Sequence, residues 1–565
     1  MSSVPPAGGP REDATGSKRH APPQLVRPGE TPPSAVLDSA HVGDIEGALG
    51  RIRLGDVGER RTRRQRLITL LAIVGPGLIV MVGDNDAGGV STYAQAGQNY
   101  GTSLLWVLLL LVPVLIVNQE MVVRLGTVTG VGHARLINER FGRFWGAFSV
   151  GDLFVLNFLT IVTEFIGVAL AAEYLGISQY AAVPLAALTL VAVATSGSFR
   201  RFERFMLAFI AVSLVLYPMA LLSHPRWGRI AHDFVVPGIQ GGVSSGAVLL
   251  IIAIVGTTVA PWQLFFQQSN VIDKRITPRF INYERTDTVL GSAVVVLGAA
   301  ALMVAADYAF RASPQHGHFS DALGVARGLG HMGHGLGTLF AIALLDASII
   351  GAVAVTLATS YAFGDVFNMR HSLHRGWRDA RKFYGSYTAM VVVAAVIVLI
   401  PGAPLGLITT SVQALAGLLL PSASVFLLLL CNDPVVLGPW VNKSWLNALA
   451  SLIIAVLLVL SGVLMATTLF PKLDVTLLFL ELSAAMAVFG GAGLVYVRIA
   501  NRGRAARPPL PPMGFEEKMA WRMPQLALLE PVKWSPGLRL GMSALRGYLV
   551  ISAVLLLVKA IRLGH

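Results

Sequence analysis

Two acidic residues, Asp84 and Asp86, lie in the middle of the first long apolar segment of the sequence, at residues 66–98. An ionised carboxylate inside a membrane helix costs several kcal/mol, so it usually has a partner or a function. Gly88 and Gly89 follow directly, and glycine allows a helix to unwind because it adopts conformations closed to other residues. This pattern predicts a cation site at a break in a membrane helix. The alternative is a pair of carboxylates that only cap the broken ends.

A second interruption, at residues 256–263, falls in the sixth apolar segment. Pro261 has no N–H and breaks the helical hydrogen-bond ladder, which frees carbonyl groups near Thr257. Interrupted helices at matching positions of two inverted halves indicate the midplane site of a transporter, whereas an isolated proline would indicate only a kink. Gln263 is a further candidate ligand, and Trp262 is interpreted as packing.

Other polar side chains lie within the apolar segments. Glu164, Asp346 and Gln413 could face a water-filled pathway, but a structural hydrogen bond explains each of them equally well. Histidines also gather between the seventh and eighth apolar segments, where we expect a solvated external loop rather than a metal site. These histidines are His316, His318, His331 and His334.

The elements that must hold these residues are membrane helices. Of the 565 residues 54% are hydrophobic and 13% charged, about half the charge of a soluble domain. Each crossing needs about 20 apolar residues, and the runs are too long for barrel strands, so the fold class is an all-α membrane bundle. The predicted helices are 66–98, 102–124, 146–174, 180–196, 205–223, 246–272, 288–310, 335–366, 382–402, 406–430, 446–469 and 474–497, with a weaker candidate at 546–562.

The net charge of +13 follows from arginines and lysines concentrated in alternate loops, beginning before the first helix. This positive-inside pattern places the N-terminus in the cytoplasm and argues against a nucleic-acid partner. No phosphate-binding Gly-x-x-x-x-Gly-Lys-Ser/Thr loop is present, so we expect no direct use of ATP. The single cysteine, Cys431, excludes an intramolecular disulfide, and no enzyme signature or zinc spacing appears.

These features predict five regions. Residues 1–60, rich in Pro, Gly and Ser, are expected to form a disordered cytoplasmic tail without a signal peptide. Residues 61–470 form a transporter core of about 11 helices, with inverted repeats at 66–223 and 246–430. The remaining regions are a further membrane helix at 471–498, a cytoplasmic loop at 499–540 and a terminal membrane or interfacial helix at 541–565.

Six segments of the sequence carry a family resemblance. They are GPGLIVMVGDNDAGGVSTYAQAGQNYGTSLLW, QEMVVRLGTVTG, FRRFERFMLAFIAVSLVLYPMALLSHPRW, GTTVAPWQLFFQQSNVIDK, SVQALAGLLLPSASVFLLLLCNDPVVLG and WVNKSWLNALASLI. In the right order over about residues 66–470, they resemble the natural resistance-associated macrophage protein (Nramp) family of divalent-metal transporters. The resemblance implies a leucine-transporter-type inverted repeat of 5+5 helices with discontinuous helices 1 and 6.

The sequence also departs from the family pattern. The family's Asp-Pro-Gly-Asn motif ends here at Gly89, so the asparagine ligand is lost, and its Met-Pro-His-Asn motif begins at Ala260, so the methionine ligand is lost. The two histidines of helix 6 are replaced by Trp262 and Gln267. The acid pair of helix 3 keeps Glu164 but has Ile161 at its other position, and the arginines of helix 9 have no clear match.

Loss of the thioether removes a preference for softer transition metals, and Mg²⁺ is bound through one or two carboxylates with several waters retained. The pattern is similar to the Nramp-related magnesium transporters. It implies uptake of Mg²⁺, and also Mn²⁺, across a bacterial-type cytoplasmic membrane, by alternating access and without proton coupling. The predicted metal-site residues are Asp86, Asp84, Thr257, Gln263, Gln413, Gly89 and Ala260, and the possible polar pathway is Glu164, Gln267 and Asp346.

Three alternatives stay open at this point. The first is a proton-coupled Mn²⁺/Fe²⁺ symporter in which Asp84 or Glu164 replaces the missing relay. The second is a symporter for a small organic solute, and the third is a membrane-embedded metal sensor. For a metal transporter the divalent cation is the substrate, so no cofactor is expected, and the oligomeric state stays open.

Overall fold

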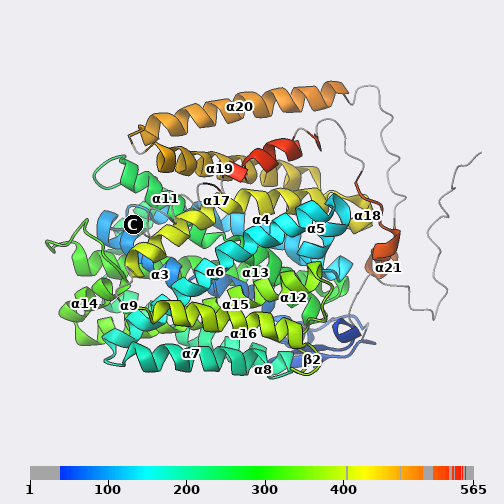
Figure 1. Ribbon diagram of the computed structural model, residues 1–565, viewed down its shortest axis with the longest axis horizontal. Helices are drawn as coiled ribbons and strands as arrows, with labels where there is room; N and C mark the ends of the chain where they lie inside the picture. The colour runs from blue at the N-terminus through cyan, green and yellow to red at the C-terminus, as the bar shows by residue number, and fades with distance from the viewer. Residues whose placement is uncertain are drawn as a thin grey trace, which may run out of the picture.

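The computed structural model describes residues 39–56, 58–401, 405–470, 472–500, 513–532 and, within 538–554, all but 540, 549, 552 and 553. Over these residues the chain is a bundle of helices lying roughly side by side, with one small sheet at one end (Figure 1). Nine of the described helices are long and apolar enough to cross a bilayer, or up to 11 if each bent pair is one span. The predicted all-α membrane fold is confirmed.

The first half of the bundle contains ten helices, several of them parts of one broken span. They are α1 (Arg63–Ile73), α2 (Pro76–Val82), α3 (Ala87–Tyr100), α4 (Leu105–Thr129), α5 (His133–Phe141), α6 (Arg143–Tyr174), α7 (Gln179–Ala194), α8 (Phe199–Ser213), α9 (Leu216–Leu222) and α10 (Trp227–Val235).

The second half begins with another broken span and continues to the C-terminal helices. Its helices are α11 (Ser245–Thr258), α12 (Pro261–Asp273), α13 (Ile281–Phe310), α14 (Ala322–Met332), α15 (His334–Val366), α16 (Arg381–Val398), α17 (Leu405–Cys431), α18 (Pro434–Leu437), α19 (Ser444–Leu469), α20 (Val475–Ala500) and α21 (Phe515–Ala520).

The long helices α6, α13 and α15 form the interior of the bundle. Helix α15 packs along α6, and α13 packs against α2, α3 and α4. Helices α7, α8 and α16 lie along one border of the view in Figure 1, and α19 and α20 lie along the opposite border. Helix α20 exposes most of its side chains, as a span that faces lipid would.

The first predicted helix, 66–98, consists of three helices. Helices α1 and α2 form a pair bent by 55° at Gly75, whose φ of +156° favours glycine. Helix α2 then ends at Val82, and α3 begins at Ala87 with Asp86 as its N-cap. The predicted break is therefore present, while the bend at Gly75 was not predicted.

The second predicted break is also present. Helix α11 ends at Thr258, Val259 and Ala260 are non-helical, and Pro261 is the first residue of α12. Proline is well suited to this position because the first helical N–H has no partner in the helix. The two interruptions lie in the first and sixth predicted helices, as expected for the two halves of an inverted repeat.

The prediction of a disordered tail over residues 1–60 is wrong for residues 39–52; residues 1–38 lie outside the described ranges. A 3₁₀ turn (Ser39–His41) precedes a hairpin of β1 (Ile45–Gly47) and β2 (Gly50–Ile52). The hairpin is held by tertiary contacts, because Ile45 and Ile52 are buried and the Ala48 N–H donates to the Glu203 carboxylate of α8. Three-residue strands are too short to show periodicity in the sequence.

Two other predicted regions differ in detail. The expected solvated loop between the seventh and eighth helices contains α14, whose Val325 and Leu329 are fully buried, so that expectation is wrong for residues 322–332. Of the predicted loop at 499–540, residues 499 and 500 end α20, and the described residues 513–532 contain α21. Most of the predicted helix at 546–562 falls outside the described residues.

Candidate metal-transport site

The two aspartates of the first break are buried but have different surroundings. The Asp86 Oδ1 accepts the Gly89 N–H at 2.7 Å and so caps α3, a favoured arrangement at a helix start. The Asp84 Oδ1 accepts a hydrogen bond from the Gln263 amide of α12, and its Oδ2 has no hydrogen-bond partner among the described residues. Asp84 and Gln263 therefore join the two helix breaks directly.

Three oxygen atoms surround the position that a side chain at residue 89 would occupy. A methyl group on Gly89 would lie 2.8 Å from the Asp84 carbonyl oxygen, 3.3 Å from the Thr257 hydroxyl and 3.4 Å from the Asp86 carboxylate. The Thr257 hydroxyl is buried without a partner among the described residues. Carboxylate, carbonyl and water oxygens are the ligands that hard divalent cations prefer. The structure thus brings Asp84, Asp86, Thr257 and Gly89 together.

Gln413 of α17 lies against the same break. Its side chain packs onto Gly88, where a methyl group would overlap the amide, and its Nε2 has no partner in the described part of the chain. Its position is set by close packing of α11 on α17, because Gly256 has no room for a side chain beside Gly417. Gln413 is therefore held within reach of the break by a contact between two glycines.

Glu164 of α6 also contacts the first break. Its Oε2 accepts the Ala87 N–H at 3.1 Å. A methyl group on Gly351 of α15 would lie 2.7 Å from this oxygen and 2.8 Å from the Asp86 Cβ, so the glycine allows the two acids to approach. Glu164 thus accepts a hydrogen bond from the first backbone N–H of α3, which supports a structural role. Its other oxygen, Oε1, has no partner among the described residues.

The remaining predicted pathway residues lie away from the break. Gln267 donates to the Thr288 hydroxyl at 3.0 Å, one helical turn beyond Gln263. Asp346 accepts from Ser213 of α8 at 2.8 Å, about 7 Å along α15 from Gly351. Among the described residues, no group of three or more His, Cys, Asp or Glu side chains is placed to hold a metal ion by itself. Neutral oxygens or water would have to complete any coordination.

Sequence reasoning missed two residues of the site. Gln119 of α4 donates to the Gln263 Oε1 at 3.1 Å, and the Tyr93 hydroxyl lies 2.7 Å from the Thr258 hydroxyl. Gln119 could have been found as an amide within an apolar helix. Tyr93 gave a weaker signal, because buried tyrosines are common in cores.

The profile of the family described as "Natural resistance-associated macrophage protein-like" matches residues 77–467. The chain belongs to this family. It is 30% identical over 405 residues to the divalent metal cation transporter MntH of Ralstonia nicotianae, covering 69% of this chain and 89% of the relative. It is also 30% identical to MntH 1 of Pseudomonas aeruginosa, over 67% and 88% of the two chains.

The Nramp fold is seen in the crystal structure of the Eremococcus coleocola manganese transporter. That structure matches with a TM-score of 0.59 and 21% identity, covering 80% of this chain and 99% of the other. The predicted family and fold class are confirmed. The N-terminal hairpin of this Nramp-family chain precedes the matched residues 77–467.

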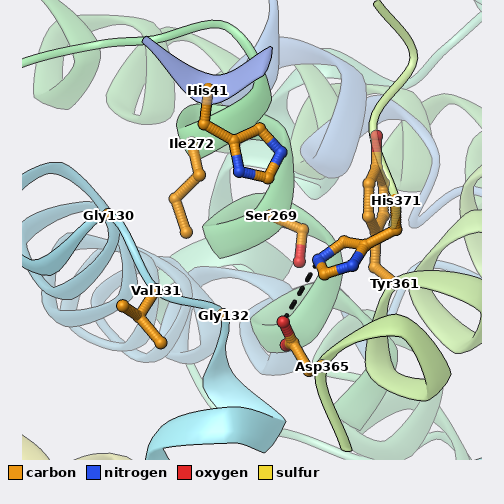
Figure 2. A pocket seen from close by; sticks show the side chains of 9 residues that line it. All are labelled: His41, Gly130, Val131, Gly132, Ser269, Ile272, Tyr361, Asp365 and His371. Carbon is orange, nitrogen blue, oxygen red and sulfur yellow. Dashed lines mark ion pairs between the residues drawn. The ribbon is translucent and has the colours of Figure 1, made fainter. Parts of the chain in front are cut away.

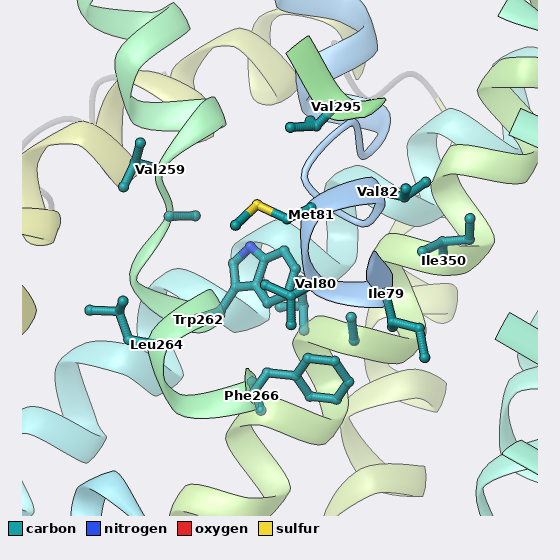
Figure 3. Close-up of a cluster of buried hydrophobic side chains, with 14 of the residues drawn as sticks. Ile79, Val80, Met81, Val82, Val259, Trp262, Leu264, Phe266, Val295 and Ile350 are labelled. Carbon is teal, nitrogen blue, oxygen red and sulfur yellow. The ribbon is translucent and has the colours of Figure 1, made fainter. Parts of the chain in front are cut away.

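Two of the departures in the sixth helix, Ala260 and Trp262, can be followed in the structure. Ala260 is buried at the non-helical joint between α11 and α12. Trp262 packs against α2, and a methyl group on Gly83 would lie 3.4 Å from its ring. Figure 3 shows the ring among apolar side chains that include Met81, Val80 and Phe266. This supports the interpretation of Trp262 as packing.

A buried ion pair fixes the bend between α1 and α2. The Lys274 ammonium lies 2.5 Å from the Glu203 carboxylate and donates to the Ile73 and Val74 carbonyls at 2.6 and 3.0 Å. On the other side of the bend, Asp287 accepts the Gly75 and Gly77 N–H groups. The backbone groups at the bend are therefore satisfied by Lys274, which follows α12, and by Asp287 of α13.

A small cavity lies at the end of the bundle that carries the hairpin (Figure 2). The His371 ring points to Asp365, with Nε2 and Oδ1 3.3 Å apart, and His41 lies 3.6 Å from Asp273. Burial alone would lower the pKa of His371, but the Asp365 carboxylate outweighs burial and raises it above the ordinary value. The cavity thus joins the N-terminal segment to α12 and α15 through two His–Asp contacts.

Proposed function

We propose that this chain transports divalent metal cations across the cytoplasmic membrane by alternating access, with its N-terminus in the cytoplasm. The relatives named above as divalent metal cation transporters support the substrate class. The concentration of Lys and Arg in alternate loops supports the orientation. The observation that carries the proposal is the convergence of oxygens of Asp84, Asp86 and Thr257 beside Gly89.

Within this class we propose Mg²⁺, partly hydrated, as the preferred substrate, with Mn²⁺ also carried. Ala260 provides no sulfur at the joint of α11 and α12, and the atoms that border the space beside Gly89 are oxygens. Mg²⁺ retains several waters and needs only one or two carboxylates. Asp86, with Asp84, supplies these, and Gln263 and Gln413 provide amide oxygens for water or metal.

We also propose that transport is not coupled to protons. The two helix-6 positions that carry histidine in the family pattern are Trp262, which packs on α2, and Gln267, which bonds to Thr288. An inside-negative potential of 100 mV contributes about 2.3 kcal/mol per charge, or about 4.6 kcal/mol for a divalent ion. This is enough to drive uptake without a second gradient.

The decisive experiment is uptake by purified protein in proteoliposomes that contain both a Mg²⁺-sensitive and a pH-sensitive dye. Asp86→Ala is expected to abolish Mg²⁺ and Mn²⁺ uptake, whereas Asp379→Ala, the same change at an exposed loop position, is expected to leave it intact. Normal uptake by the Asp86 variant would refute the site.

A second candidate, a proton-coupled Mn²⁺/Fe²⁺ symporter, is favoured by one observation. Glu164 is fully buried beside Asp86, and its Oε1 has no partner in the described part of the structure. The same experiment separates the two functions, because coupled transport would acidify the vesicle lumen when metal enters. Under our proposal the lumen pH stays constant when an ionophore clamps the membrane potential.

A further inference from the structure

A second cavity, unrelated to the helix breaks, lies where the ends of α4, α13 and α19 meet α21. It has a volume of about 430 Å³. Four cationic side chains line it, each from a different segment: Arg124 of α4, Arg285 of α13, Lys443 before α19 and Lys518 of α21. The cavity therefore collects positive charge from parts of the chain up to almost 400 residues apart.

Among the described residues that line the cavity, Glu120 is the one acidic side chain. Glu120 lies 2.5 Å from Arg285 and 3.1 Å from Arg124, so it bridges the two arginines. Arg124 is further fixed by the Trp440 carbonyl at 2.7 Å and the Asn442 side chain at 2.5 Å. If all five groups are ionised, the cavity carries a formal excess of three positive charges. The two arginines, held in place by these contacts, provide part of this positive charge.

Within the described part of the chain, Lys443 and Lys518 form no ion pair with a carboxylate, unlike the two arginines. The Lys518 ammonium lies 4.5 Å from the centre of the Trp440 ring, and the Trp440 indole donates to the Lys518 carbonyl at 3.1 Å. Burial lowers the pKa of Lys518, and the charges of Lys443, Arg285 and Arg124 lower it further. The cations thus repel one another, and a bound anion would relieve this repulsion.

The walls of the cavity are apolar on one side. Ile116, Val117 and Leu446 line it together with Trp445, whose side chain is 63% exposed at the start of a membrane helix. Tryptophan is enriched at the level of the lipid head groups. Basic pockets between membrane helices on the cytoplasmic side are suited to anionic head groups. Charge, aromatic residues and apolar wall are therefore combined at one membrane boundary.

We propose that this cavity binds a phosphate-bearing anion, either the head group of an anionic phospholipid or a free phosphate compound. Lys443 and Lys518 contact the phosphate, and the Glu120-linked arginines provide the fixed positive field. Since α21 contributes Lys518, the anion holds the segment after α20 against the ends of α4, α13 and α19. The site is independent of the proposed metal-transport function.

The test uses the full-length protein and measures thermal stability and ligand affinity in two arms. In the first, nanodiscs of phosphatidylcholine are supplemented with phosphatidylglycerol. In the second, inorganic phosphate or pyrophosphate is added to protein in pure phosphatidylcholine. Stabilisation in the first arm alone identifies a lipid, and stabilisation in the second identifies a free phosphate compound. Lack of stabilisation in both arms overturns the proposal.

The variant that locates the site is Lys443→Gln/Lys518→Gln. Each basic residue near an anionic surface contributes about 1 kcal/mol, so the double change is expected to weaken anion affinity by about 30-fold. Arg201→Gln, an exposed change on α8, is expected to leave the affinity unaltered. Lys443→Gln alone changes only an exposed side chain. It is expected to weaken anion affinity as well, and it can be measured even if the double variant is unstable. Unchanged affinity in Lys443→Gln, or an equal loss in Arg201→Gln, would overturn the proposal.

Discussion

At the scale of single residues, the site is defined as much by small side chains as by acids. Gly89 lets three oxygens come close together, Gly88 accommodates Gln413, and Gly351 lets Glu164 approach Asp86. Ala260 is the small residue at the joint between α11 and α12. A larger side chain at any of these positions leaves every proposed ligand in place. Such variants therefore test the shape of the site separately from its charge.

Gly89→Ala is expected to reduce Mg²⁺ uptake by at least tenfold. The new methyl group would lie 2.8 Å from the Asp84 carbonyl, so the break must shift, at a cost of about 1–3 kcal/mol. Uptake rates in proteoliposomes and apparent melting temperature check this together. A loss of stability without a loss of uptake would mean that the space beside Gly89 is not used.

Ala260→Met is expected to shift the metal preference toward Mn²⁺ and Cd²⁺ over Mg²⁺ by about tenfold, equivalent to about 1.4 kcal/mol, because a thioether favours softer metals. Competition of each metal against Mn²⁺ uptake measures the ranking. Ala260→Leu is the matched control, since it adds similar volume without sulfur. The same ranking in both variants would show that volume, and not ligand chemistry, is responsible.

At the scale of elements, most helix boundaries could be predicted from the lengths of the apolar runs in the sequence. The two helix breaks could be predicted from the Asp, Gly and Pro residues within them. The predicted helix 335–366 is α15 at His334–Val366, and the predicted break at 256–263 contains Val259 and Ala260. Contacts between distant segments could not be predicted. Ala48 reaches Glu203 across 155 residues, and Gln119 reaches Gln263 across 144. No local pattern in the sequence contains such pairings.

The Lys274–Glu203 pair at the α1–α2 bend gives a prediction at this scale. Lys274→Met leaves Glu203 buried without a counter-charge and is expected to destabilise the protein by about 3–5 kcal/mol. The double variant Lys274→Met/Glu203→Met is expected to recover most of this loss. Apparent melting temperatures of the single and double variants measure the coupling. Additive losses would show that the two charges do not stabilise each other.

At the scale of the whole molecule, the N-terminal segment connects helices from both halves of the bundle. Its hairpin contacts α1 and α8, and His41 reaches the end of α12 beside the His371–Asp365 pair. The groups that face His371 are Asp365 and Tyr361 of α15, Asp273 of α12 and His41 of the segment itself. This contact is therefore sensitive to protonation.

The raised pKa of His371 predicts how stability depends on pH. A group with a raised pKa in the folded state contributes stability that is fully present below its unfolded pKa, about 6.5, and lost as pH rises through the folded value. His371→Asn is expected to flatten the melting temperature over this window. His331→Asn, an exposed histidine of α14, is the control. An unchanged pH profile in the His371 variant would contradict the assignment.

The position of helix α1 has a consequence for the rate of transport. Its Leu67, Ile68 and Leu71 side chains are exposed and follow the arginines of its first turn, a composition suited to lying within the head-group layer. It is joined to α2 at a 55° angle, and its end is clamped by Lys274. Any reorientation of α2 during transport would therefore also move α1 sideways through the lipid. The viscosity of the bilayer would then act as friction on the transport cycle, so turnover should slow in stiffer membranes even when the ion gradient is unchanged.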